Sequence, residues 1–168
     1  MRPGNALAMM LAAAALAGCA EVAKTTGEPT FYNSMAQPGA TLDANAAASM
    51  ISGYRANNGL PAVTVDPQLM QLADAQARAM AARNRIDHIP ASAFTARLKS
   101  AGYSAKTAAE NVSAGYHTLA EAFSGWRDSP PHRANMLLKG ATKMGISAVY
   151  VPGSKYKVFW SLIVAEPG

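Results

Sequence analysis

From Asp43 onward, hydrophobic residues recur at intervals of three and four, which is the spacing of amphipathic helices. The first predicted helix begins at the N-cap Asp43 and ends at the Asn-Asn-Gly turn of residues 57–59. A short extended piece at 63–65 leads to a second helix, which begins after the N-cap Asp66 and a proline. A third, shorter helix is predicted over about 92–101. The first part of the domain is therefore expected to be helical.

A fourth predicted helix begins after Thr118. Thr118 and Glu121 have the spacing of a capping box, in which each side chain bonds the backbone of the other residue. The inner stripe of this helix is expected to consist of Leu119, Ala122, Phe123 and Trp126. The Ser-Pro-Pro sequence at 129–131 ends the helix, and Trp126 is predicted to belong to the core.

Towards the C-terminus the pattern changes from a helical period to alternation. Residues 144–150 alternate between hydrophobic and small or polar positions, which is typical of a half-buried strand. After a Pro-Gly-Ser turn, residues 156–165 form a second strand that is apolar on both faces from Val158 onward. Helices followed by a C-terminal hairpin predict an α+β domain, with the sheet between helical layers.

The N-terminus carries a different kind of signal. Arg2 is followed by 12 apolar residues, Ala6–Ala17, which are too few to span a bilayer but fit the hydrophobic region of a signal peptide. The sequence of residues 16–19, Leu-Ala-Gly-Cys, resembles the lipobox of bacterial lipoproteins, in which Cys19 would be lipidated after cleavage. An ordinary signal peptide with an incidental cysteine is the alternative.

These features divide the chain into a lipoprotein signal peptide (1–18), a lipidated cysteine with a flexible tether (19–42) and a domain (43–168). Phe31 and Tyr32 could instead dock on the domain. The expected partner is a bacterial membrane, contacted through lipidated Cys19. Because Ala20 rather than an aspartate follows the cysteine, sorting rules favour the outer membrane facing the periplasm; the cell surface and the inner membrane are the alternatives.

Composition narrows the chemistry. One cysteine in 168 residues excludes an intramolecular disulfide and a cysteine-cluster metal site. The net charge of +5 is modest, and we expect no nucleic-acid partner. The chain has no HExxH, GxSxG, P-loop or glycine-rich dinucleotide turn, which removes the commonest hydrolase and nucleotide-dependent functions.

What remains is a set of short motifs in a fixed order. They are Tyr54-Arg55, Asp87-His88, Phe94 with Arg97, Ala109–Val112 (A-E-N-V) and Trp126–Leu137 (W-R-D-S-P-P-H-R-A-N-M-L). Together they resemble the CAP superfamily of cysteine-rich secretory proteins, antigen 5 and plant pathogenesis-related class-one proteins. The resemblance is closest to the cysteine-free bacterial branch and covers about residues 43–166. It implies an α-β-α sandwich with a central antiparallel sheet and a C-terminal β-hairpin.

In that family, two histidines and two acidic residues typically line a central cleft. Carried over by position, the histidines are His88 and His132, and one acidic residue is Glu110. The second acidic position falls on Ser129, so the set of four is incomplete. Asn111, beside Glu110, is expected to hold the loop backbone in place. A purely structural carboxylate remains an alternative for Glu110.

Three functions fit these residues. The first is a binding module for small apolar ligands, envelope polymers or partner proteins, and the missing second carboxylate favours it over an enzyme. The second is a metal-dependent hydrolase or peptidase, in which His88, His132 and Glu110 hold a divalent metal such as zinc and leave one coordination position open. The third is a structural envelope protein without cleft chemistry.

Overall fold

The structure, a computed structural model, describes residues 27–87 and 91–168, apart from the side chains of 91–93. The signal segment 1–18, Cys19 and His88 lie outside the described residues. The described elements are η1 (Thr30–Tyr32), α1 (Ala44–Ala56), β1 (Thr64–Val65), α2 (Pro67–Arg83), α3 (Ala91–Ser100), β2 (Ala105–Ala114), α4 (Leu119–Asp128), α5 (Pro130–Met136), β3 (Lys143–Tyr150) and β4 (Val158–Pro167).

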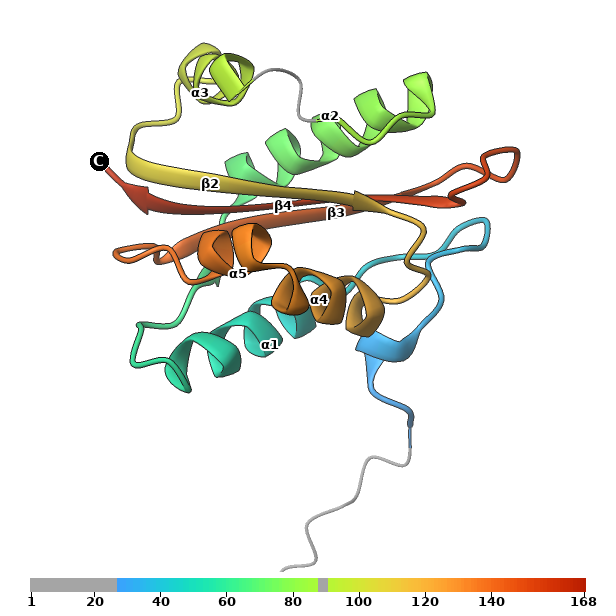
Figure 1. Cartoon of the computed structure of the whole chain (residues 1–168), viewed down its shortest axis with the longest axis horizontal. Coiled ribbons are helices and arrows are strands. Elements are labelled where there is room, and N and C mark those ends of the chain that lie inside the picture. The colour runs from blue at the N-terminus through green and yellow to red at the C-terminus, as the bar shows by residue number, and fades with distance from the viewer. Residues whose placement is uncertain (1–26, 88–90) are drawn as a thin grey trace, which may run out of the picture.

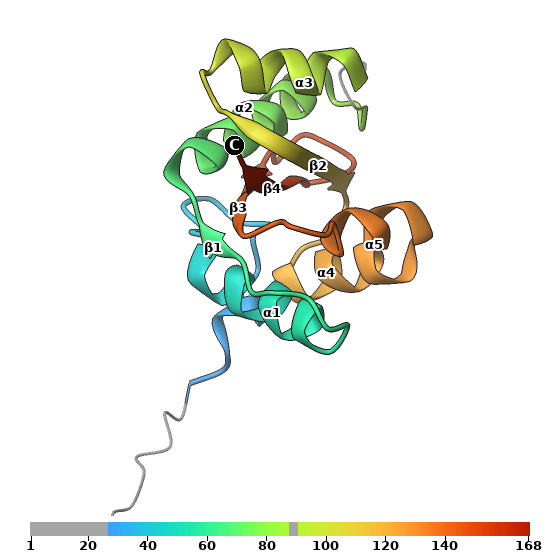
Figure 2. The same cartoon turned by 90° about the vertical axis from the view of Figure 1, so that its left-hand side faces the viewer.

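The elements form three layers. A β-sheet lies in the middle, α2 and α3 cover one face, and α1, α4 and α5 cover the other (Figure 1). The view along the sheet in Figure 2 separates the two helical layers. The predicted α-β-α sandwich is therefore confirmed, and so is its C-terminal hairpin, β3–β4.

The strand order is β1-β3-β4-β2. β3 pairs antiparallel with β4, and β4 pairs antiparallel with β2. The two-residue β1 adds a parallel pairing, with Thr64 opposite Lys143 and Val65 opposite Met144, so the sheet as a whole is mixed. β4 lies between β3 and β2, and its residues from Val158 to Ala165 are buried, as a strand covered on both faces requires.

Two elements go beyond the helices and strands predicted from periodicity. The first is β2, whose sequence is dominated by small and polar residues and lacks regular alternation. The second is α5, which begins at Pro130, directly after the residue that ends α4. Proline is favoured in the first turn of a helix because its fixed φ suits a helical start and no N–H is needed there. The same prolines thus end one helix and begin the next.

The larger core lies on the α1–α4 side of the sheet. Leu119, Ala122 and Trp126 of α4 are buried, and Phe123 packs against the same core from its edge, which confirms the predicted inner stripe. The indole of Trp126 meets that of Trp160 on β4 edge to face, with ring centroids 6.4 Å apart. Aromatic pairs favour this geometry because it brings the positive ring edge to the negative ring face.

The packed part of the chain begins before Asp43. Met35 is only 4% exposed, and its N–H donates to the carbonyl of His117 (2.6 Å). Phe31 packs partly buried against the core, whereas Tyr32 is 51% exposed. Residues 30–42, which were expected to be either flexible tether or docked on the domain, therefore dock. The apolar side chains of this segment cover the edge of the core. In the described part of the chain, no helix has the length and hydrophobicity needed to cross a membrane.

Candidate functional site

Four of the predicted site residues lie on two neighbouring elements. Glu110 and Asn111 are consecutive residues of β2, an edge strand of the sheet. His132 lies on α5, and Ser129 is the residue at which α4 ends and α5 begins. Figure 1 shows α5 next to the sheet, on the face opposite α3. The fold thus brings these residues to one edge of the sheet.

Amide hydrogen bonds fasten α5 to β2. The Asn111 amide donates to the backbone carbonyl of His132 (2.9 Å). In return, the Asn135 amide of α5 donates to the Glu110 carbonyl (3.1 Å) and to Asn111 Oδ1 (2.9 Å). Asn111 is 1% exposed, so an unpaired amide there would be costly. Asn111 was expected to hold a loop; the backbone that its amide bonds belongs instead to helix α5.

Glu110 and Asn111 serve opposite faces of the sheet. Successive side chains of a strand alternate, and directly paired residues share a face. Glu110 pairs with Ile163, which packs in the cluster under α2 and α3. Asn111 pairs with Leu162, which packs in the larger core on the α1–α4 side. The side chain of Glu110 therefore points to the α2–α3 layer, away from the layer that contains α5.

The carboxylate of Glu110 is held by an arginine. Arg97 of α3 donates from Nη2 to Glu110 Oε1 at 2.5 Å, and the carboxylate side chain is 2% exposed. The same guanidinium donates to the amide oxygen of Gln76 and lies over the ring of Phe94, 5.4 Å from its centroid. Gln76, which is 1% exposed, donates to the carbonyl of Asp87 (3.1 Å). Glu110 is thus part of a polar network that joins α2, α3 and β2.

The sequence assigns no role to Gln76 and Arg97 of this network, or to Asn135 of α5. Arg97 belongs to a motif with Phe94, three residues earlier on the same helical face, which alone indicates no charge partner. Gln76 had a usable signal, because it is a polar residue on the apolar face of the second predicted helix. Asn135 belongs to the Trp126–Leu137 motif, but the motif does not indicate what it contacts. Its partners lie 24 and 25 residues away in the chain.

Ser129 is the residue predicted to stand at the second acidic position of the cleft. It is half-buried, and its side chain makes no capping hydrogen bond to α5. The neighbouring Asp128 does not take over that position, because its carboxylate bonds to Arg127 (2.8 Å) and its side chain is 67% exposed. The hydrogen bond from Arg127 holds the pKa of Asp128 below its ordinary value. The charge of Asp128 is therefore directed to solvent and to Arg127.

The predicted metal site cannot be assembled from the described residues alone. Within residues 27–87 and 91–168, no three His, Cys, Asp or Glu side chains form a group that could hold a metal ion. His88, the third proposed ligand, lies outside that range. A site made by His88, His132 and Glu110 stays a prediction. In such a site, the metal ion would have to compete with the guanidinium of Arg97 for the Glu110 carboxylate.

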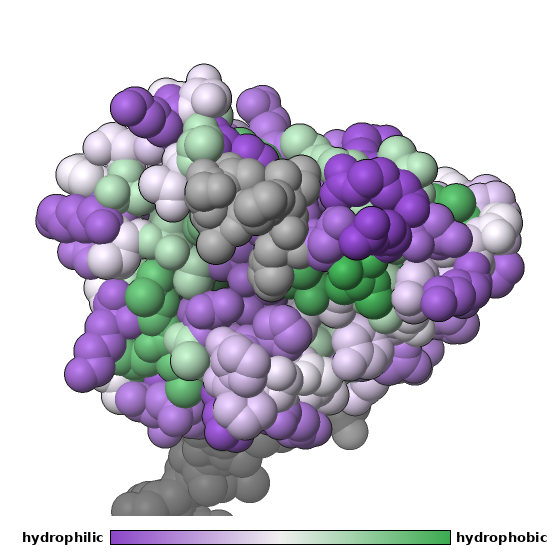
Figure 3. All heavy atoms as spheres, turned by 45° about the horizontal axis from the view of Figure 1, so that its top comes forward, coloured by the Kyte–Doolittle hydropathy of each residue, from purple (hydrophilic) through white to green (hydrophobic). Residues whose placement is uncertain are grey.

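A group of arginines lies near the C-terminal end of α2. Arg83 pairs with Asp87 (2.8 Å), and Arg85 lies 3.8 Å from the same carboxylate. Arg78, five residues before Arg83, pairs with Asp74 (2.6 Å). Figure 3 shows strongly hydrophilic side chains gathered toward this end of the α2–α3 face. Two carboxylates oppose three guanidinium groups here, so most of the positive charge is neutralised locally.

Comparison with known proteins shows which family has these motifs and this fold. The family model described as CAP, the cysteine-rich secretory protein family, matches residues 48–164. The chain belongs to the CAP family. A curated relative, the uncharacterized protein YkwD of Bacillus subtilis strain 168, is 31% identical over 140 residues, which cover 82% of this chain and 54% of YkwD. The chain thus spans about half the length of this curated relative.

Solved structures resemble the CAP domain at lower identity. An outer surface protein from Borrelia burgdorferi has a TM-score of 0.65 at 17% identity, covering 77% of this chain and 99% of that protein. An extracellular SCP-domain protein from Bacillus anthracis has a TM-score of 0.61 at 20% identity, covering 76% and 45% of the two chains. These likenesses show a shared fold. By name, one relative is extracellular and the other belongs to an outer surface, which agrees with an envelope or surface location.

Proposed function

We propose that this chain is a lipid-anchored protein of the bacterial cell envelope whose CAP domain binds an envelope component without turning it over. The ligand is a small apolar molecule, an envelope polymer or a partner protein. Binding takes place at the β2–α5 region, the edge of the sheet where His132 lies. Asn111 holds α5 there, and Glu110, on the other face of β2, keeps the strand in position. Cys19 supplies the anchor.

The observation that carries this proposal is the ion pair of Arg97 with Glu110. A carboxylate that acts as general base or metal ligand needs lone pairs directed at the substrate or the ion. Here Glu110 Oε1 accepts a charge-assisted hydrogen bond of 2.5 Å, and the side chain is 2% exposed. The pair gives Glu110 the character of a fixed structural anion that positions β2. With Ser129 at the second acidic position, this favours binding over acid–base chemistry.

The anchoring part of the proposal rests on the sequence of residues 16–19 and on the surface location of structural relatives. Eleven residues separate Cys19 from the start of the packed segment at Phe31. Such a stretch reaches at most about 40 Å when fully extended. The tether would therefore keep the domain close to the membrane, where envelope components are concentrated.

Purification of the full chain from the envelope tests the proposal. We expect the protein to retain an envelope component that mass spectrometry can identify after unfolding. Glu110→Gln should lower the retained amount, because the loss of its charge releases Arg97 and loosens β2. The matched control is Glu166→Gln, since Glu166 forms a more exposed pair with Lys106 (3.6 Å) on the same sheet. An empty wild-type protein, or equal retention by both variants, would contradict the proposal.

Zinc titration separates this proposal from the metal-dependent hydrolase. Because the guanidinium of Arg97 competes with a metal ion for the Glu110 carboxylate, we expect Glu110→Gln to leave the heat of zinc binding unchanged. Calorimetry on the wild type, on Glu110→Gln and on His88→Ala/His132→Ala measures this. Stoichiometric zinc binding that is lost in both variants would favour the hydrolase.

A further inference from the structure

One edge of the sheet is left open beyond the end of β1. β1 pairs with β3 only through Thr64 and Val65, after which the chain turns into α2. β3 continues from Met144 to Tyr150 and pairs with β4 along its other side. In the described part of the chain, the strand order places no strand beside this last part of β3.

Hydrogen bonds near the start of β3 establish which backbone groups point to that edge. The Met144 carbonyl accepts from the N–H of Asp66 (2.8 Å), and the N–H of Ile146 donates to Met70 Sδ (3.2 Å). Both groups therefore point away from β4. In an antiparallel pair the direction alternates along the strand, so Ala148 and Tyr150 direct their N–H and C=O groups to the same open edge. No described residue makes a hydrogen bond to them there.

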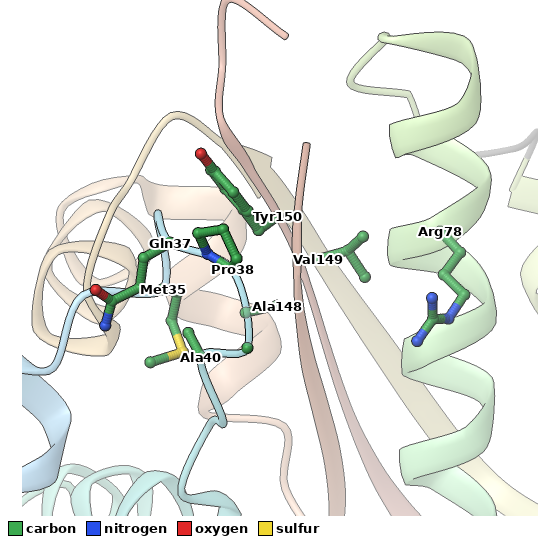
Figure 4. Close-up of a pocket in the computed structure, with 9 residues that line it drawn as sticks. Met35, Gln37, Pro38, Ala40, Arg78, Ala148, Val149 and Tyr150 are labelled. Atoms are coloured by element: carbon green, nitrogen blue, oxygen red, sulfur yellow. The ribbon is translucent and has the colours of Figure 1, made fainter. Parts of the chain in front are cut away.

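A pocket of about 300 Å³ lies at this open stretch. Figure 4 shows its two sides: the loop from Met35 to Ala40 on one side of β3, and Arg78 of α2 on the other. The loop does not complete the sheet. Pro38 has no N–H, and the N–H of Ala40 turns back to the carbonyl of Gln37 (3.4 Å).

Among the described residues, Arg78 is the only charged one that lines the pocket. Its side chain is 69% exposed, and only its Nε takes part in the pair with Asp74. An exposed ion pair of this kind contributes little to stability. The two terminal nitrogens of the guanidinium make no hydrogen bond to a described residue, so they can donate to a second carboxylate.

From this geometry we propose that the open edge of β3 binds an extended acidic peptide of a partner protein. The peptide adds a strand beside Ala148 and Tyr150, and its carboxylate pairs with Arg78. Backbone hydrogen bonds supply the affinity, as in other cases of strand addition, and Arg78 supplies the preference for acidic sequences. This site lies across the sheet from the β2–α5 region, since β3 and β2 are separated by β4.

A second copy of the chain is the competing occupant of an open edge. Two copies would meet through the same edge around a twofold axis, which brings both Arg78 residues to one short interface. Like charges at that position oppose the pairing. The terminal donors of Arg78 can bind the carboxylate of an acidic peptide, whereas a second copy would bring another arginine to the same place, so an acidic peptide is favoured over self-association.

The test uses the full chain in detergent and three blocked hexapeptides that alternate valine and threonine and carry a central glutamate, glutamine or lysine. We expect the glutamate peptide to bind and to slow hydrogen exchange at the amides of Ala148 and Tyr150 at least about tenfold. Arg78→Gln should weaken its binding about tenfold, as the loss of a charge-assisted hydrogen bond requires. Arg85→Gln is the matched control, because Arg85 is equally exposed and lies outside the pocket.

A second variant keeps the test independent of charge. Ala148→Pro removes an N–H that points away from β4, so the β3–β4 pairing keeps its hydrogen bonds while strand addition is blocked. Its melting temperature checks the fold. The proposal would be overturned if no peptide bound with a dissociation constant below about 1 mM. Equal binding of the glutamate and lysine peptides, or unchanged hydrogen exchange at Ala148 and Tyr150, would overturn it as well. Dimerisation of the free chain that Ala148→Pro abolishes would assign the edge to a second copy instead.

Discussion

At the scale of single residues, Arg55 makes the most extensive set of buried polar contacts in the described part of the chain. It is fully buried, and its guanidinium donates to the carbonyls of Pro61 (2.9 Å), Met136 (2.8 Å), Leu138 (3.0 Å) and Ala141 (2.7 Å). Burial lowers the pKa of this guanidinium, which nevertheless stays charged at neutral pH. One side chain thus joins the loop after α1 to the segment that follows α5.

We expect Arg55→Met to destabilise the domain by about 3 kcal/mol or more, because it leaves several buried carbonyls without donors. Arg55→Lys should lose less stability, since an ammonium group can donate to up to three of the carbonyls. Urea unfolding followed by circular dichroism measures both. The control is Arg127→Met, which removes only an exposed pair and should cost less than about 1 kcal/mol. Equal losses at the two positions would show that Arg55 is not a structural anchor.

A second prediction at this scale concerns pH. Asp43 caps α1: its carboxylate accepts from the N–H of Ala46 (2.9 Å) and from the hydroxyl of Thr30 (2.9 Å). These bonds, the one from Ala46 first, lower the pKa of Asp43 below its ordinary value of 3.8. A lowered pKa means that the carboxylate stabilises the fold above pH 3.8, and that this contribution disappears as the pH falls through the pKa of the folded state.

Asp43→Asn isolates that contribution, because the amide oxygen can still cap the helix but does not titrate. At neutral pH the wild type should be the more stable protein, since a negative charge favours a helix N-terminus. We expect the difference in stability between the wild type and Asp43→Asn to shrink as the pH is lowered below 3.8. The difference between the two urea midpoints, measured across this range, is the readout. A difference that does not change with pH would contradict the assignment.

At the scale of elements, the contact between α2 and β3 depends on a glycine. A β-carbon on Gly145 would overlap with the backbone carbonyl of Leu69, so the helix lies closer to the strand than any other residue allows. Gly145→Ala should therefore push α2 from the sheet and cost about 1–3 kcal/mol. Gly53 is the matched control, since it is exposed in α1 and a β-carbon there meets nothing within 4 Å.

Gly53→Ala is expected to stabilise the domain by about 0.5–1 kcal/mol, because alanine is the better helix former. In thermal unfolding, we therefore expect the melting temperature of Gly145→Ala to fall and that of Gly53→Ala to rise. A loss of stability in both, or in neither, would show that the spacing between α2 and β3 is not set by Gly145.

The elements also show what the sequence could and could not predict. Helices with apolar stripes and side-chain caps were found because capping and spacing are local properties, as at Thr118 and Glu121. β2 was not found, because Glu110 and Asn111 interrupt its apolar pattern and both are buried. Their burial is stabilised by Arg97 and Asn135, which are distant in the chain. Periodicity cannot indicate a strand whose polar residues are satisfied by tertiary contacts.

The candidate site, like the fold, could be predicted only in part from the sequence. The family motifs indicated Glu110, Asn111 and His132, and the fold brings β2 and α5 together. The ion pair that changes the chemistry of Glu110 was not foreseen. It depends on how α3 packs over the sheet, and Arg97 lies 13 residues from Glu110 in the chain. Motifs indicated the residues, and only the packing indicated their charge partners.

At the scale of the whole molecule, the central prediction about location concerns Cys19. We expect metabolic labelling with a fatty acid to modify the wild type and not Cys19→Ala, which should leave the membrane fraction. Ala20→Asp is the informative companion variant: it should keep the label and move the protein from the outer to the inner membrane. Equal labelling of wild type and Cys19→Ala would show that the leader is an ordinary signal peptide.

One measurement tests the proposed binding without turnover directly. The component retained by the full chain is recovered, returned to the unfolded and refolded protein with added zinc, and followed by mass spectrometry. We predict that it binds again and that its mass does not change with time, because Arg97 holds the carboxylate of Glu110. Accumulation of a cleaved product by the wild type, and its absence with His88→Ala/His132→Ala, would contradict the account.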